Sequence, residues 1–296
     1  MLNERLGHGP EEKLVIIHAD DIGMCHSANR ASLAALQKGL VTCGAVMFPC
    51  PWVLEFAKMF KEIPDVPIGV HLTVTCEWEF YRWGPVAPRG QVAGLIDAQG
   101  YLPHRGPEVA ARVTALEFER EVRAQIERAF ELGFHPTHID HHMIVPPQRK
   151  DLFEIYVRLG KEYGIPPQIF RFHENDYAGL REQGVDASYF DRLEAEGFPI
   201  IDGRLRARAG GKTLDELRAA YHESFRRAKP GVNMIKLHLG MYDDELIGVM
   251  GEERAAARFN DFQVFTSEMT RQAAQEAGVK IISWKPIKEA FDKAMK

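Results

Sequence analysis

The chain has 296 residues, of which 45% are hydrophobic and 27% charged, and its formal net charge is -5 at pH 7. This composition is ordinary for a globular protein, and the acidic balance argues against nucleic acid as a partner, because phosphate binding favours a basic surface. No stretch approaches the roughly 18 apolar residues of a membrane-spanning helix, so no membrane partner is expected. Four cysteines without a CxxC pair predict reduced thiols and a cytoplasmic location.

Short apolar runs alternate with amphipathic helical patterns along most of the chain. The runs predict strands at 14–17, 42–48, 68–75, 137–143, 169–172, 199–201, 232–239 and 279–284. The patterns between them predict helices at 28–40, 52–63, 116–132, 152–163, 214–229 and 253–277. About eight β-α units predict one α/β domain, a closed or nearly closed parallel barrel with its core at about residues 13–290. A doubly wound open sheet is the alternative.

Two long connections interrupt this alternation, at 76–113 and 173–198. Both leave the carboxyl end of a predicted strand. Structureless connections of this length in a compact domain are usually functional. We therefore expect them to form lids or substrate walls on the side of the barrel that carries the chemistry.

Two adjacent carboxylates, Asp20 and Asp21, follow the first apolar run. They are expected at the carboxyl end of a buried strand, where α/β folds keep their active sites. Adjacent carboxylates repel each other unless a cation neutralises one of them or a proton is shared. The pair therefore favours a functional site over a helix cap or a turn.

Histidines occupy the other predicted strand ends. His71 lies in the third run, His138 and His142 lie with Asp140 in the fourth, and His238 lies in the seventh. Because strand side chains alternate between faces, His138, Asp140 and His142 are expected to project the same way. A carboxylate with two imidazoles and an open position is a recurrent set of catalytic metal ligands. The pattern predicts a divalent metal site.

Three segments carry a family resemblance, at 20–23 (DDIG), 69–73 (GVHLT) and 136–142 (PTHIDHH). In order and spacing they resemble the signature blocks of the YdjC-like carbohydrate deacetylases of the ChbG/HpnK type. The resemblance extends over residues 13–284. It implies a single (β/α) barrel-like deacetylase domain and a hydrolase that acts on the amide bond of an N-acetylated sugar.

The resemblance also implies roles for individual residues. It makes Asp21, His71 and His138 the ligands of one divalent ion, zinc or magnesium, and Asp20 the base. The chain departs from the family in having Ile144 where many members have a further histidine. It also has its own sequence at 77–85, so a chitooligosaccharide substrate is not implied.

Hydrolysis of an acetamide needs a base for water and an acid for the departing amine. Asp20 is placed to take the proton of the attacking water. His238 is the expected acid, with His142 as the alternative. Asp140 could orient a ring nitrogen of a neighbouring imidazole.

The first long connection offers candidate substrate contacts. Trp78, Tyr81 and Trp83 could stack on sugar rings, or could pack as a lid on the barrel. Arg82 could meet an anionic group of the substrate or pair with a neighbouring glutamate. Both interpretations remain open for each residue.

Other functions compatible with these residues are a sugar isomerase, a phosphoester hydrolase and a sugar-binding protein without turnover. Isomerases and two-metal hydrolases usually use more carboxylate ligands than the strand ends supply. The expected partner in every case is a small carbohydrate. The sequence leaves open whether the chain is a monomer or a homo-oligomer.

Overall fold

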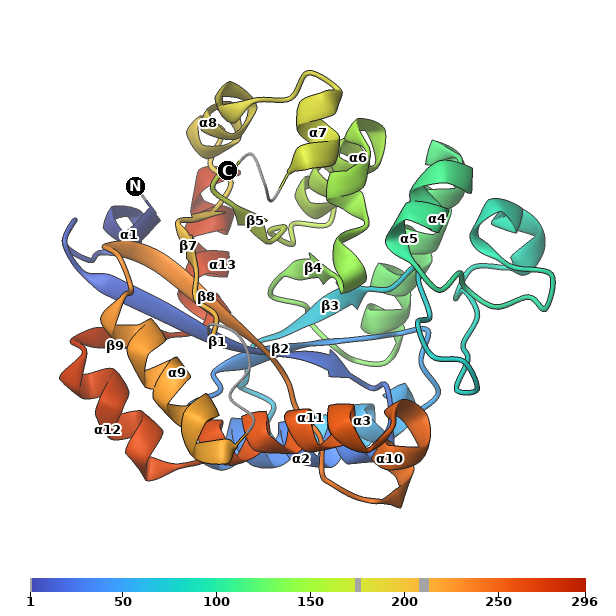
Figure 1. The fold of residues 1–296 in the computed structure, drawn as a ribbon. Coiled ribbons are helices and arrows are strands. Elements are labelled where there is room, and N and C mark those ends of the chain that lie inside the picture. The colour runs from blue at the N-terminus through green and yellow to red at the C-terminus, as the bar shows by residue number, and fades with distance from the viewer. Residues whose placement is uncertain (1, 174–176, 208–212) are drawn as a thin grey trace.

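The computed structural model describes residues 2–173, 177–207 and 213–296, and its centre is a curled parallel sheet (Figure 1). The sheet order is β4-β3-β2-β1-β8-β7, with β9 also paired to β1 and a separate β5-β6 pair. The strands are β1 (Lys13–Ile22), β2 (Cys43–Val46), β3 (Ile68–Leu72), β4 (Ile139–His141), β5 (Ile169–Phe170), β6 (Ile200–Ile201), β7 (Gly203–Arg204), β8 (Gly231–His238) and β9 (Val279–Ile282).

Short links bring the two sheets into one barrel-like wall. A parallel bridge joins Ile139 of β4 to Pro167 just before β5, and β7 directly follows β6 and pairs with β8. The strands from β1 to β8 therefore follow one another around the wall in chain order. The expected single barrel-like α/β domain is confirmed, and every run predicted as a strand overlaps one, whereas β7 was not predicted.

Helices surround this sheet, with α5 and α6 beside β3 and β4, and α2, α3, α10 and α11 along the opposite side (Figure 1). The helices are α1 (Leu2–Arg5), α2 (His26–Lys38), α3 (Val53–Met59), α4 (Gly106–Arg112), α5 (Ala115–Glu131), α6 (Lys150–Glu162), α7 (Ala178–Glu182), α8 (Ala187–Ala195), α9 (Leu214–Arg226), α10 (Asp244–Met250), α11 (Glu252–Phe265), α12 (Glu268–Glu276) and α13 (Trp284–Ala294). The parallel strands are buried on both faces, which explains their continuous apolar runs.

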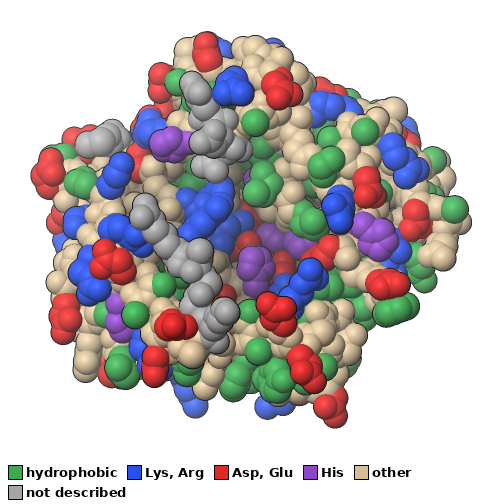
Figure 2. Space-filling model, in the orientation of Figure 1, with side chains coloured by type: hydrophobic (Ala, Val, Ile, Leu, Met, Phe, Trp, Pro, Cys, Tyr) green, Lys and Arg blue, Asp and Glu red, His purple; other side chains and the backbone are tan. Residues whose placement is uncertain are grey.

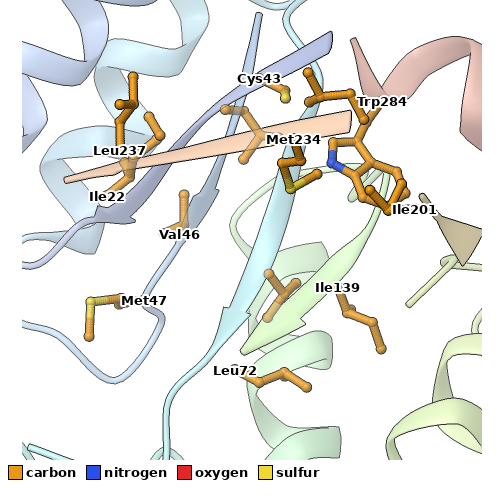
Figure 3. Close-up of a cluster of buried hydrophobic side chains, with 14 of the residues drawn as sticks. Ile22, Cys43, Val46, Met47, Leu72, Ile139, Ile201, Met234, Leu237 and Trp284 are labelled. Carbon is orange, nitrogen blue, oxygen red and sulfur yellow. The ribbon is translucent and has the colours of Figure 1, made fainter. Parts of the chain in front are cut away.

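The core fills the space within and around the curled sheet. Ile22, Val46, Leu72 and Ile139 contribute to it from four neighbouring strands (Figure 3). Trp284, at the start of α13, is fully buried among these apolar side chains. All four cysteines are buried free thiols. None of the helices in the described ranges is long and apolar enough to cross a membrane.

Two expectations about the helical regions are wrong. The predicted helix 253–277 is two helices, α11 and α12, because Ser267 caps α12 by accepting a hydrogen bond from the amide of Met269. The connections 76–113 and 173–198 are not structureless, since the first carries α4 and the second carries α7 and α8. Residues 174–176 of the second connection lie outside the described residues.

The connection 76–113 is held to the barrel by a buried carboxylate on α5. Glu121 accepts hydrogen bonds from the backbone amides of Val86 and Ala87, each at 2.9 Å, and from Gln125 at 2.8 Å. Burial raises the pKa of Glu121 to about 7. The loop is therefore fastened through buried polar contacts as well as through its apolar side chains.

Replacing Glu121 with alanine should lower the free energy of unfolding by about 3 kcal/mol, because two buried amides lose their acceptor. Denaturant unfolding measures this change. Glu131→Ala, at an exposed position of the same helix, is the matched control and should change stability by less than about 0.5 kcal/mol. Equal effects of the two variants would show that Glu121 does not fasten the loop.

Candidate active site

A cavity of about 660 Å³ opens at the carboxyl ends of the strands. Its walls include Asp20, Asp21, His71, His142 and His238. Figure 2 shows the hollow on this face, with histidine side chains gathered in it beside a patch of Lys and Arg. This is the side of a parallel barrel on which active sites are found. The cavity is the candidate active site.

Both aspartates line this cavity although they are neighbours in β1. Adjacent strand residues normally point to opposite faces. Asp21, however, has φ of 61°, and the pairing of β1 with β2 shifts register between Ala19 and Ile22. A left-handed conformation is uncommon for a residue other than glycine, and such strain concentrates at functional sites. The distortion turns both carboxylates into the same space.

Three side-chain atoms converge at the floor of the cavity. Oδ1 of Asp21 lies 3.3 Å from Nε2 of His71 and 3.3 Å from Nδ1 of His142. All three residues are buried, and Oδ1 of Asp21 and Nε2 of His71 make no other hydrogen bond within the described residues. Ligand atoms about 2.0–2.2 Å from a common ion lie roughly 3–3.5 Å apart. The donor set and its spacing therefore fit a divalent ion.

A carboxylate holds the far nitrogen of each imidazole. Oδ1 of Asp140 lies 2.7 Å from Nδ1 of His71, which is the orienting contact expected for Asp140. Oε2 of Glu77 lies 2.9 Å from Nε2 of His142. Metal-binding histidines commonly have such carboxylate partners, which fix the ring and its tautomer. Glu77, in the first long connection, was not predicted to take part.

The same carboxylates set the protonation of these rings. Burial alone would lower the pKa of His71, but Asp140 and Asp20 raise it to about 10. Burial would also lower the pKa of His142, but Glu77 outweighs this effect and raises the pKa to about 9. Without a cation between them the two rings therefore carry protons at neutral pH. A bound ion would have to displace those protons, as metal binding to histidine generally does.

A second buried group, formed by His18, Asp20 and Asp140, also has ligand atoms close together. Here the cation is supplied by the chain. Nζ of Lys236 lies 3.0 Å from Oδ2 of Asp20 and 2.8 Å from Oδ2 of Asp140. These carboxylates overcome the effect of burial and raise the pKa of Lys236 to about 12. The ammonium group neutralises this second group of carboxylates.

Arg258 on α11 supplies a second cation beside the aspartate pair. Its Nη2 lies 2.7 Å from Oδ2 of Asp21. Burial would raise the pKa of Asp21, but Arg258 holds it well below its usual range. Oδ2 is thus engaged by Arg258, and Oδ1 is the oxygen turned toward the two imidazoles.

His138, the third ligand that the family resemblance implies, does not belong to this cluster. Its Nε2 lies 2.7 Å from Nε2 of His18, and its ring stacks on Trp284 at 4.5 Å between centroids. His138 lies four residues before His142 in the chain and is not among the residues that line the cavity, whereas His142 is. The structure places His142 against Asp21 and His71 instead.

His238 lies at the end of β8, and its side chain is 48% exposed. Its Nε2 is 4.0 Å from Oδ2 of Asp21. It thus faces the cavity near the carboxylate pair, while both ring nitrogens of His142, the alternative acid, already have carboxylate partners.

Of the four predicted substrate contacts in the first connection, only Trp78 lines the cavity. The guanidinium of Arg254 lies 5.4 Å from the centre of a Trp78 ring. Tyr81 donates a hydrogen bond to the carbonyl of Met24. Trp83 donates to the carbonyl of Thr75 at 3.0 Å.

Arg82 also faces the protein. It pairs with Asp97 at 2.8 Å and donates to the carbonyl of Leu102 at 2.8 Å. With Tyr81 and Trp83 it therefore stabilises the connection, and none of these three residues is among those that line the cavity.

Several known proteins resemble this chain along most of its length. A carbohydrate deacetylase of Enterococcus faecalis is 32% identical over 278 residues, which are 93% of this chain and 98% of that protein. A chitooligosaccharide deacetylase of Yersinia enterocolitica is 25% identical over 288 residues, covering 92% and 98% of the two chains. A carbohydrate deacetylase of Thermus thermophilus is 37% identical, but the match covers only 57% of each chain.

A solved structure from Enterococcus faecalis V583 has the same fold. It superposes with a TM-score of 0.76 at 23% sequence identity, covering 93% of this chain and 99% of that one. The family model described as YdjC-like protein matches residues 14–276, which include the three sequence blocks and Asp21, His71 and His142. The chain belongs to the YdjC-like protein family.

Proposed function

We propose that this chain is a metal-dependent carbohydrate deacetylase that hydrolyses the N-acetyl group of an amino sugar. The observation that carries the proposal is the cluster of Asp21, His71 and His142, with two buried atoms lacking partners, on the floor of a cavity that also holds Asp20 and His238. The names of the full-length relatives in Enterococcus and Yersinia support the same chemistry.

Asp21, His71 and His142 are the residues that would hold the ion. Two imidazoles and one carboxylate form a set that suits zinc, whereas magnesium prefers oxygen ligands. When bound, a divalent ion supplies polarisation of the acetamide carbonyl and a lowered pKa for water. We therefore favour one transition-metal ion of the zinc type per chain, with Lys236 serving as the second positive charge.

Asp20 is the proposed base. Burial opposes its ionisation, but Lys236 lowers the pKa of Asp20 below its usual range, so the carboxylate is charged at neutral pH. Its Oδ1 is held by His18 at 2.7 Å, which leaves Oδ2, near Lys236, as the oxygen that takes the proton of water. The ammonium of Lys236 also limits repulsion between Asp20 and Asp140.

His238 is the proposed acid, which protonates the departing amine. His238→Ala should lower kcat on an N-acetyl amino sugar by about 10²-fold, because an amine leaves poorly without a proton. An activated aryl acetate releases a stable phenolate, so its hydrolysis should fall by less than about tenfold. Equal losses on the amide and the ester would instead assign His238 a role in positioning.

Release of acetate from N-acetylglucosamine and its β-1,4-linked oligomers, in the presence of zinc, tests the proposed function. We expect acetate and free amine in equal amounts, and no release by Asp21→Asn. Interconversion of aldose and ketose would identify a sugar isomerase, and phosphate release from a sugar phosphate would identify a phosphoester hydrolase. Binding of the oligomers without any product would overturn the proposal in favour of a sugar-binding protein.

A further inference from the structure

Two fully buried histidines, His18 and His138, form a pair below the cavity and are not among its lining residues. Within the described residues, the pair is hydrogen-bonded to the proposed catalytic residues through Asp20. Nδ1 of His18 lies 2.7 Å from Oδ1 of Asp20, and Nε2 of His18 lies 2.7 Å from Nε2 of His138. Neither ring has a part in the proton transfers proposed above.

Neighbouring residues in the barrel interior hold the imidazole of His138 in place. Trp284 stacks on His138 with an angle of 9° between the rings, and Oγ1 of Thr137 lies 3.0 Å from its Nδ1. On the neighbouring strand β3, a Cβ at Gly69 would lie 2.5 Å from Nε2 of His138. Only a residue without a side chain leaves room there. The position of His138 is therefore fixed from several sides.

The chemistry of the two groups fixes the direction of the hydrogen bond between His18 and Asp20. An ionised carboxylate only accepts hydrogen bonds, so Nδ1 of His18 must carry the proton that it shares with Asp20. Nε2 of His18 then either donates to His138 or accepts from it, and both arrangements leave the donation to Asp20 intact. Oδ1 of Asp20 thus accepts a hydrogen bond from His18, and the buried ring of His138 holds the His18 ring in place.

We propose that His18, braced by His138, is a positioning residue that holds Oδ1 of Asp20 and so turns Oδ2 toward the cavity. Oδ2 lies 3.0 Å from Nζ of Lys236 and 4.0 Å from Nε2 of His71. This inference rests on the proposed role of Asp20 as base. A misplacement of about 1 Å in a catalytic group can cost about 10²-fold in rate.

Two substitutions at position 18 separate donation from packing. The amide of asparagine can place an N–H near the position of Nδ1, so His18→Asn should keep kcat within about threefold of the parent. His18→Leu keeps much of the volume but removes the donor, and it should lower kcat by about 10–10²-fold with KM and zinc content unchanged. A loss in His18→Asn as large as in His18→Leu would overturn the proposal.

The double variant His18→Leu/His138→Leu tests the same proposal if the single variant His18→Leu fails to fold. Replacing both partners leaves no buried ring nitrogen unsatisfied, which is far less costly than removing one of them. It should show the same loss of kcat. An active double variant with the kcat of the parent would contradict the inference.

A double-mutant cycle with Asp20→Asn tests whether His18 acts through Asp20. In that background His18→Leu should cause little further loss, because the two changes remove the same contribution. Equal fold losses in both backgrounds would show that His18 acts elsewhere.

Crystal structures of His18→Asn and His18→Leu give a readout that does not depend on turnover. We expect the Asp20 carboxylate to keep its orientation in the asparagine variant and to rotate in the leucine variant. An unmoved Asp20 in the leucine variant would overturn the positioning role. Rotation of Asp20 in a protein that releases no acetate would uphold that role and reject the deacetylase.

Discussion

Asp21→Asn should remove the bound ion and the activity together. The amide is a poorer ligand than a carboxylate, and the change removes the one negative charge of the cluster formed with His71 and His142. Loss of the several kcal/mol that a catalytic ion supplies corresponds to a fall in kcat of at least about 10³-fold.

Metal analysis of the purified variant, together with acetate release, measures both effects of Asp21→Asn. Asp191→Asn, at an exposed position of α8, is the matched control and should retain ion and activity. A variant at position 21 that still carries one ion per chain would remove Asp21 from the ligand set.

Asp20→Asn should keep the ion but lose the base. Its carboxylate is held by His18 and Lys236 and lies 4.0 Å or more from the nearest ring nitrogen of His71, so it is not needed to complete the cluster. We expect kcat to fall on the order of 10³–10⁴-fold, with zinc content unchanged.

Comparison of Asp20→Asn with Asp21→Asn therefore separates the two neighbouring carboxylates. Zinc content and kcat, measured on both variants in one preparation series, give the answer. Equal loss of zinc from both would show that the proposed division between base and ligand is wrong.

Most strands were predictable because buried parallel strands have continuous apolar runs, such as Leu14–Ile17 before the aspartate pair. The break between α11 and α12 was not, because an apolar periodicity can continue across a cap. Ser267 ends the pattern locally through one side-chain hydrogen bond, which is a weak signal in a polar surface helix.

The different positions of His138 and His142 relative to the cavity have a geometrical cause. Alternation along a strand predicts which face a side chain occupies, but the depth at which it lies depends on where the strand ends. His138 and His142 project toward the same interior, yet only His142 lies at the cavity floor. The positive φ values of Met143 (50°) and Ile144 (56°), directly after it, are unfavourable for these residue types and have no clear sequence signal.

Lys236 and Arg258, which contact Asp20 and Asp21, were not predicted, for different reasons. Lys236 could have been predicted from the sequence, because it lies in an otherwise apolar strand, two residues before His238. A buried ammonium group needs a buried anion as its partner. Arg258 could not have been predicted, since it lies on a helix whose charged residues are typical of a solvent-exposed face. Its proximity to Asp21 is a product of tertiary packing alone.

The most direct test is the zinc content of two matched variants, His142→Gln and His138→Gln, each purified and dialysed against the same zinc buffer. Glutamine keeps a polar amide in each place but is a poor zinc ligand. We predict that His142→Gln binds no zinc tightly, whereas His138→Gln retains one ion per chain. Zinc retained by His142→Gln and lost from His138→Gln would contradict the metal centre described here.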